Sequence, residues 1–188
     1  MKRGNPGRKS MGKTRNNGLR GWSLALSVFL VIGMLISLFL IYEHFSEGAS
    51  QFCTFSEGLD CGVVNKSPYA NLDGLSYLLT IDFGLPLPLI DISGINVFLD
   101  FITTNAFLGF LTLLFIFLLL LAKYKKRDFL WISEGQSIKW VRGLLIFGVA
   151  YGLYLFFIQH FILKTYCIVC LGLDAVLIIS AIISWKIK

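Results

Sequence analysis

Four cysteines in two close pairs are the residues of this chain whose type and spacing best suit chemistry. Cys167 and Cys170 are three positions apart at the start of a long apolar run, and Cys53 and Cys61 are eight apart in a polar stretch. A Cys-x-x-Cys pair can close a disulfide within one turn, and a helix N-terminus favours the thiolate that attacks disulfides. The spacing suggests a thiol–disulfide relay, in which a mobile pair meets a partner and a fixed pair lies beside the electron acceptor.

The segment between Cys53 and Cys61 contains glycine and serine, which suits the mobile pair. Cys170 would lie one turn deeper than Cys167, ~4.5 Å along the helix axis, where a lipid-soluble acceptor such as a quinone has access. Two alternatives stay open, namely a pair of structural disulfides and a tetrahedral four-cysteine metal site. The small ring of a Cys-x-x-Cys disulfide adds little stability, and the spacing of Cys53 and Cys61 is wide for a zinc knuckle. We therefore prefer the redox interpretation and expect no metal.

The elements that must position these cysteines are membrane-spanning helices. The 188 residues suit one domain, with 56% hydrophobic residues, 15% charged residues and a mean hydropathy of +0.74. Apolar runs of about 20 residues cross a hydrocarbon core of ~30 Å as helices. We predict an all-α integral membrane protein, a four-transmembrane-helix bundle with these spans: 22–42, 101–122, 143–163 and 165–185.

The distribution of charge predicts the topology. Residues 1–21 carry seven basic residues and no acid, and we expect a disordered cytoplasmic tail. Residues 43–100 carry eight acids and one base, so this long connection should be extracytoplasmic, where disulfides form. Both termini are then cytoplasmic, and the two cysteine pairs share the outer face. The net charge of +6 does not indicate nucleic acid, because the basic residues cluster beside apolar runs.

The second half of the outer connection is too apolar for an ordinary loop. We expect a half-helix near residues 72–81, followed by an irregular apolar segment, because Gly84, Pro86 and Pro88 oppose a continuous helix. These apolar side chains should lie against the bilayer surface or cap the bundle. In the third span, Gly148 and Gly152 have the spacing that lets two helices approach closely.

With these residues in view, the chain resembles the vitamin K epoxide reductase family. The resemblance covers nearly all of the chain after the tail: four spans, a cysteine pair eight apart in the first outer loop, and Cys-Ile-Val-Cys opening the fourth helix. Ser67, six residues after Cys61, is also typical of the family. The Ser-Pro-Tyr-Ala sequence that begins at Ser67 resembles prokaryotic members in particular.

The resemblance implies a function for each cysteine. Cys53 would exchange with the thiols of a thioredoxin-like extracytoplasmic partner, Cys61 would pass electrons to Cys167, and Cys170 would react with a quinone of the ubiquinone, menaquinone or vitamin K type. In a prokaryote, in the plasma membrane, the expected direction supports disulfide formation in exported proteins. The alternatives are a reductase of vitamin K epoxide or quinone, in the endoplasmic reticulum membrane of a eukaryote, and a four-span scaffold with structural disulfides.

The resemblance also implies quinone-binding residues. Ser67 would lie near the quinone ring, and Asn105 resembles an asparagine that hydrogen-bonds a quinone carbonyl in animal members. Asp174 stands where animal members have a tyrosine; it shares a helix face with Cys167 and Cys170, and an ionisable residue within a span is a functional candidate. Packing contacts are the alternative for Asn105 and Asp174. We expect His160 at the membrane interface rather than in a proton path.

Overall fold

A computed structural model of the protein describes residues 7–46, 53, 58–125 and 134–187. Within these residues, four helices are long and apolar enough to cross a membrane. Their apolar parts are Gly21–Phe45, Asn105–Tyr124, Gln136–Leu163 and Ile168–Lys186. All four prolines of the chain lie outside these segments, so no span loses a backbone hydrogen bond to a proline ring. The predicted all-α membrane bundle is confirmed.

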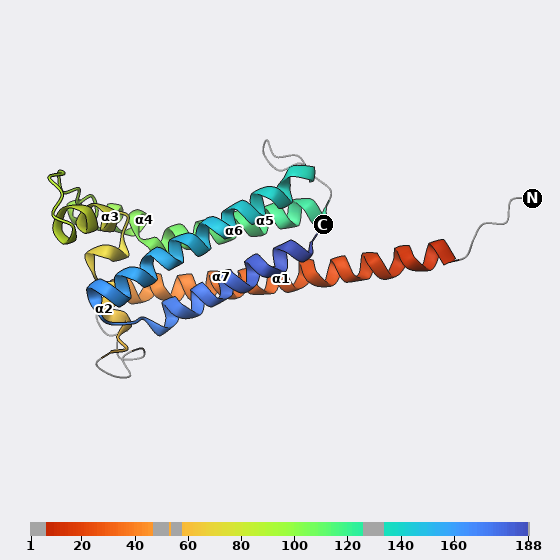
Figure 1. The fold of residues 1–188 in the computed structure, drawn as a ribbon, viewed down its shortest axis with the longest axis horizontal. Helices are drawn as coiled ribbons and strands as arrows, with labels where there is room; N and C mark the ends of the chain where they lie inside the picture. Colours follow the sequence, from red (N-terminus) through yellow and green to blue (C-terminus); the bar gives the residue numbers. More distant parts are fainter. Residues whose placement is uncertain (1–6, 47–52, 54–57, 126–133, 188) are drawn as a thin grey trace, which may run out of the picture.

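The four long helices lie side by side (Figure 1). Helix α1 (Gly7–Phe45) packs against α5 (Asn105–Tyr124) and α7 (Ile168–Lys186). Helix α6 (Glu134–Phe157), which a π turn at Ile158–Leu163 continues, packs against the same two helices. Figure 1 places the C-terminus at one end of the bundle and the short helices that follow α1 at the other. The N-terminal part of α1 and the C-terminus lie toward the same end of the bundle in Figure 1, as spans that alternate in direction require.

Apolar side chains on the inner faces of the long helices form the main core of the bundle. This cluster includes Leu26, Leu30, Leu113, Ile116, Leu119, Leu145 and Ile183, all of which are buried. Many apolar side chains on the outer faces are exposed, as expected where lipid replaces water. Gly33 of α1 faces Leu113 of α5, and a Cβ at this glycine would lie only 3.0 Å from the leucine methyl group. The bundle is therefore held by apolar packing and close helix approach.

The connection between α1 and α5 consists of short helices at one end of the bundle (Figure 1). In chain order they are α2 (Cys61–Asn65), a 3₁₀ turn (Pro68–Ala70), α3 (Gly74–Tyr77), a π turn (Leu78–Asp82), a 3₁₀ turn (Ser93–Ile95) and α4 (Val97–Thr103). The half-helix predicted near residues 72–81 is found at 74–82. The irregular apolar segment follows it, with Gly84 in the left-handed region at φ 64°. Its apolar side chains are exposed, and their contact with the bilayer remains a prediction.

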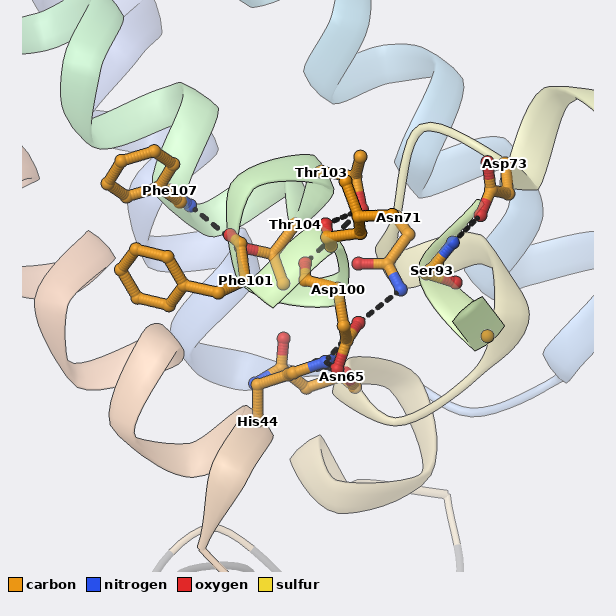
Figure 2. A network of polar contacts seen from close by, with 12 residues as sticks. His44, Asn65, Asn71, Asp73, Ser93, Asp100, Phe101, Thr103, Thr104 and Phe107 are labelled. Atoms are coloured by element: carbon orange, nitrogen blue, oxygen red, sulfur yellow. Dashed lines mark hydrogen bonds and ion pairs between the residues drawn. The ribbon is translucent and has the colours of Figure 1, made fainter. Parts of the chain in front are cut away.

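A polar network ties this connection to the end of α1 (Figure 2). The imidazole of His44 contacts the carbonyl oxygen of Asn65 at 2.5 Å with Nδ1 and the carboxylate of Asp100 at 3.2 Å with Nε2. Asn71 donates a hydrogen bond of 2.8 Å to the same carboxylate. The Asn65 amide in turn donates to the carbonyl of Leu40 at 2.7 Å. One carboxylate on α4 and one imidazole on α1 thereby fix α2 and the turn after it over the bundle.

The structure differs from the prediction at the starts of α1 and α5, although the first apolar span begins at Gly21, close to the predicted residue 22. Residues 7–21 are helical rather than disordered, because extending a helix that has already nucleated costs little per residue. The second span begins at Asn105 rather than at residue 101. Thr104 leaves the helical conformation (φ −59°, ψ 135°), and its hydroxyl accepts a hydrogen bond from the Phe107 amide at 3.2 Å. Residues 1–6 of the predicted tail lie outside the described residues.

The third and fourth spans also begin elsewhere than predicted. Helix α6 begins at Glu134, within the stretch expected to be a loop before residue 143. Its Arg142 donates hydrogen bonds to the carbonyls of Ser184 and Ile187 at 3.2 and 2.6 Å and lies over the Trp185 ring at 4.9 Å. This charged side chain therefore binds free carbonyl groups at the C-terminal end of α7 and does not mark the start of a span. Helix α7 begins at Ile168 rather than at residue 165.

Candidate redox site

Each predicted cysteine pair is a disulfide. Cys53 and Cys61 are joined with a Cα–Cα distance of 5.5 Å, and Cys167 and Cys170 with one of 5.2 Å. Cys53, Cys61 and Cys167 are buried, whereas Cys170 is half-buried. In this oxidised form no cysteine offers the thiolate that a four-cysteine metal site would need.

Backbone pairing holds the segments directly before Cys61 and Cys167 side by side. Leu59 and Tyr166 form an isolated parallel β-bridge. The amide of Asp60 donates to the Tyr166 carbonyl at 3.1 Å, and the amide of Tyr166 donates to the Gly58 carbonyl at 3.0 Å. Cys61 and Cys167 each lie one residue beyond this pairing. Both cysteines, together with Cys53, belong to one buried cluster that also includes Leu40, Val64 and Ala106.

Cys167 is held in place at the N-terminus of α7. It is the N-cap of that helix, and its Sγ accepts a hydrogen bond from the amide of Cys170 at 3.1 Å. Its own amide donates to Oε1 of the buried Gln159 at 2.9 Å. The 19 residues of α7 present their positive dipole end to this sulfur, which favours a thiolate there. Because Cys167 precedes the helix, the predicted shared helix face applies only to Cys170 and Asp174.

The half-buried Cys170 lines a pocket together with the three predicted binding residues, Ser67, Asn105 and Asp174. The rest of the lining is mostly apolar: Leu40, Val64, Ala106, Leu155, Ile158, Leu163 and Leu173. A second, mainly apolar pocket between α5, α6 and α7 is also lined by Asn105 and Asp174. These two polar residues therefore stand where the space beside Cys170 meets the space inside the bundle.

The Asn105 side chain is oriented by two hydrogen bonds. Its Nδ2 donates to the Tyr69 carbonyl at 2.9 Å, and its Oδ1 accepts from the Tyr151 hydroxyl at 2.7 Å. An asparagine amide has two hydrogens, so one remains for an acceptor in the pocket. Ser67 donates to the carbonyl of Val64 at 2.8 Å, which leaves its oxygen free to accept.

Asp174 lies against a glycine of the neighbouring helix. A Cβ at Gly152 of α6 would collide with the Asp174 carboxylate, and one at Gly148 would lie 3.5 Å from a methyl of Leu177. Both glycines thus face α7, which is the close helix approach that their spacing predicted. The missing side chain of Gly152 makes the room that the carboxylate occupies.

Several residues of this site were not predicted from the sequence. Gln159 holds the Cys167 amide, and Tyr151 holds Asn105. Tyr69 lines the pocket and donates to Asp82; burial, and next the hydrogen bond to Asp82, raise its pKa. The only signal for Tyr69 is its place in the Ser-Pro-Tyr-Ala sequence. Gln159 does have a signal, because it is a polar amide residue in a largely apolar span, whereas Tyr151 has none.

His160 and Glu43 lie near the disulfides but outside the pocket. His160 is exposed and contacts the hydroxyl of Tyr166 at 2.5 Å, beside the backbone pairing described above. Glu43, in the last turn of α1, is buried. One of its carboxylate oxygens and the sulfurs of Cys53 and Cys61 lie within 4.8 Å of one another.

The pocket residues fit a quinone head group. Such a ring needs apolar walls and hydrogen-bond donors for its carbonyl oxygens, and the lining supplies both through its leucine and isoleucine side chains and through Asn105. The half-buried disulfide at Cys170 reaches the same space. The arrangement thus places a half-buried disulfide beside a mostly apolar space that also contains a hydrogen-bond donor.

Comparison with known protein families agrees with this chemistry. A model of the vitamin K epoxide reductase family matches residues 24–185, which include the four apolar helices almost completely and all four cysteines. No curated protein matches the chain significantly.

Proposed function

This chain belongs to the vitamin K epoxide reductase family, and we propose that it passes electrons from a thioredoxin-like partner to a quinone. Membership and the four apolar helices indicate an integral membrane oxidoreductase. The observation that carries the finer proposal is the place of Cys170. Among the described residues that line the pocket, it is the only cysteine, and it lies there with Ser67, Asn105 and Asp174. A scaffold with two structural disulfides would not need this access.

The first exchange takes place at the Cys53–Cys61 disulfide. A thiolate of the partner attacks Cys53, and the electron pair of the broken sulfur–sulfur bond goes to Cys61. The partner's second thiol then displaces Cys53, so the partner leaves with a disulfide. Because Cys53 is 2% exposed here, this exchange requires a conformation in which its sulfur is accessible.

The second exchange moves the electrons to α7. The thiolate of Cys61 attacks Cys167, and the electron pair of the Cys167–Cys170 bond goes to Cys170. Cys53 then attacks Cys61, which restores the first disulfide and leaves Cys167 as a thiolate. Two features support this order: the backbone pairing before Cys61 and Cys167, and the helix N-terminus at Cys167, which stabilises the departing thiolate.

The pocket residues bind and orient the acceptor beside Cys170. When the Cys167–Cys170 disulfide forms again, its two electrons and two protons would pass to a bound quinone, which leaves as the quinol. The remaining hydrogen of the Asn105 amide holds a carbonyl oxygen, and the leucine side chains exclude water. Asp174 holds a proton close to the same space. The predicted topology places this site on the extracytoplasmic face, with both termini in the cytoplasm.

Quinone reduction by the purified protein tests the proposal. We would reconstitute it in liposomes with menaquinone or ubiquinone, add reduced thioredoxin as the probe, and follow the loss of quinone absorbance. Cys170→Ala should abolish quinone reduction. Ser180→Ala is the matched control, because Ser180 is a buried residue of α7 that lines neither pocket, and it should reduce quinone at the wild-type rate.

Two outcomes would contradict the proposal. If the wild type reduces neither quinone while both disulfides resist reduction, the disulfides are structural. If the protein acts only on vitamin K epoxide with added dithiol, the electrons flow in the reductive direction instead.

A further inference from the structure

A buried carboxyl group beside the Cys53–Cys61 disulfide has no function in the exchange steps above. Glu43 is 0% exposed in the last turn of α1. Neither of its carboxylate oxygens has a hydrogen-bond partner among the described residues. One of these oxygens and both sulfurs of the disulfide lie within 4.8 Å of one another.

The charged groups around Glu43 are engaged elsewhere. Among the described residues, Asp60 and Lys66 are the charges that act on it electrostatically. The Asp60 carboxylate accepts the Val63 amide at 3.1 Å, and Lys66 donates to the Ser46 carbonyl at 2.9 Å. The adjacent His44 turns its ring to Asp100. Glu43 has no ion-pair partner among the described residues, so the disulfide form of the protein favours its neutral, protonated carboxyl.

We propose that Glu43 is the proton donor and acceptor of the Cys53–Cys61 pair. This inference rests on the proposed function, because it assigns the proton that accompanies each thiol–disulfide exchange. The distance allows transfer to a sulfur directly after a small movement, or through one water. A buried glutamine or leucine would fill the same space at lower cost, but neither carries a proton that it can give and take back.

The proton moves in two steps. When the partner's thiolate attacks Cys53, the Cys53–Cys61 bond breaks and Cys61 receives its electron pair. Glu43 donates its proton to Cys61 and becomes a carboxylate. When Cys61 later attacks Cys167, its thiol proton returns to the Glu43 carboxylate, and the electron pair of the Cys167–Cys170 bond goes to Cys170. Glu43 is then protonated as at the start, and no other oxidant or reductant is needed.

The first step can be measured without quinone or partner. In a Cys167→Ser/Cys170→Ser background, only the Cys53–Cys61 disulfide remains, and dithiothreitol is the probe. Thiols that appear with time are alkylated and counted by mass spectrometry at several pH values, and rates are expressed per concentration of dithiothreitol thiolate. Glu43→Gln is the test, and Ser37→Ala is the matched control, because Ser37 is also a buried polar side chain of α1 without a hydrogen-bond partner among the described residues, but it carries no acidic proton.

We expect Glu43→Gln to slow disulfide opening near neutral pH by about a hundredfold, the usual size of a general-acid contribution. The loss should shrink as the pH falls, because solvent then supplies the proton. Glu43→Asp should keep the shape of the wild-type pH profile at a lower rate, and Ser37→Ala should remain close to wild type. The infrared difference spectrum between the disulfide and dithiol forms should contain a carboxyl carbonyl band that Glu43→Gln removes.

An unchanged rate, or an equal loss at every pH for Glu43→Gln, would overturn the proton function and leave a packing function. The two proposals fail separately. If the wild type does not reduce quinone but Glu43→Gln changes the pH profile of disulfide opening, only the quinone-linked function is wrong. If the wild type reduces quinone and the profile is unchanged, only the assignment of Glu43 is wrong.

Discussion

The amide of Asp60 donates a hydrogen bond of 3.1 Å to the carbonyl of Tyr166, although the two residues are far apart in the sequence. The next residue after each is a cysteine of a different disulfide. This contact therefore brings the start of α2 and the start of α7 together. The buried cluster around Cys61 and Cys167 follows from it. Backbone hydrogen bonds and side-chain packing thus both hold Cys61 and Cys167 in one region of the fold.

Replacing Asn105 by alanine should weaken quinone binding. The variant loses the amide hydrogen that faces the pocket, and a hydrogen bond of this kind contributes about 1 kcal/mol. KM for quinone should rise several-fold, while the rate at saturating quinone changes less. Tyr151→Phe is the control for orientation, because it removes only the contact to Oδ1 of Asn105. An Asn105→Ala variant with the wild-type KM would show that Asn105 only packs.

Asp174→Asn should slow turnover or change its pH profile. Asparagine has nearly the same shape but carries no exchangeable acidic proton, so a defect would report proton transfer rather than packing. The measurement is steady-state quinone reduction over a range of pH, with thermal unfolding in detergent as a check on stability. Wild-type kinetics at every pH would exclude Asp174 as a proton carrier.

The two glycines of α6 give a paired test of the packing around Asp174. Gly152→Ala places a methyl group against the Asp174 carboxylate, and overpacking of this kind costs about 1–3 kcal/mol. Gly148→Ala, one turn away, meets only ordinary contacts with Leu177. Thermal unfolding in detergent should show a lower midpoint for Gly152→Ala alone. Equal unfolding midpoints for the two variants would contradict a tight contact between Gly152 of α6 and Asp174 of α7.

The pKa of Tyr69 predicts an alkaline loss of stability. Burial, and then the hydrogen bond to Asp82, raise this pKa above its ordinary value of about 10. As the pH rises above about 10, the unfolded chain loses this proton before the folded protein does, so the free energy of unfolding falls. Tyr69→Phe should remove this part of the pH dependence, as measured by chemical denaturation. Tyr124→Phe, an exposed tyrosine at the far end of α5, should leave it unchanged.

The sequence predicted the spans because lipid imposes a simple requirement of length and apolar character, and it predicted both cysteine pairs because their spacing is short. The ends of helices were harder. Thr104 ends α4 and caps α5 within a run that has no charged residue, and Arg142 serves a helix end that lies far away in the sequence. Thr104 has a local signal, because it lies in a polar Thr-Thr-Asn sequence and threonine is a common N-cap residue, whereas no local pattern marks Arg142.

In the candidate site, too, some residues could be predicted from the sequence and others could not. Ser67, Asn105 and Asp174 were predicted by resemblance or by a charge within a span, and the structure places all three in the pocket of Cys170. Glu43 was counted only among the acids of the outer loop. Its burial against Cys53 and Cys61 depends on tertiary packing, which the sequence does not reveal.

The transfer of electrons from Cys61 to Cys167 is the central claim, and trapping it is the most direct test. In Cys53→Ala/Cys170→Ala, each remaining cysteine has lost its own partner. Mild oxidation followed by non-reducing peptide mapping should find Cys61 linked to Cys167 as the main product. The control Cys61→Ala/Cys170→Ala should leave Cys53 and Cys167 largely as thiols. Free Cys61 and Cys167 in the test variant, or equal linkage in the control, would contradict the account.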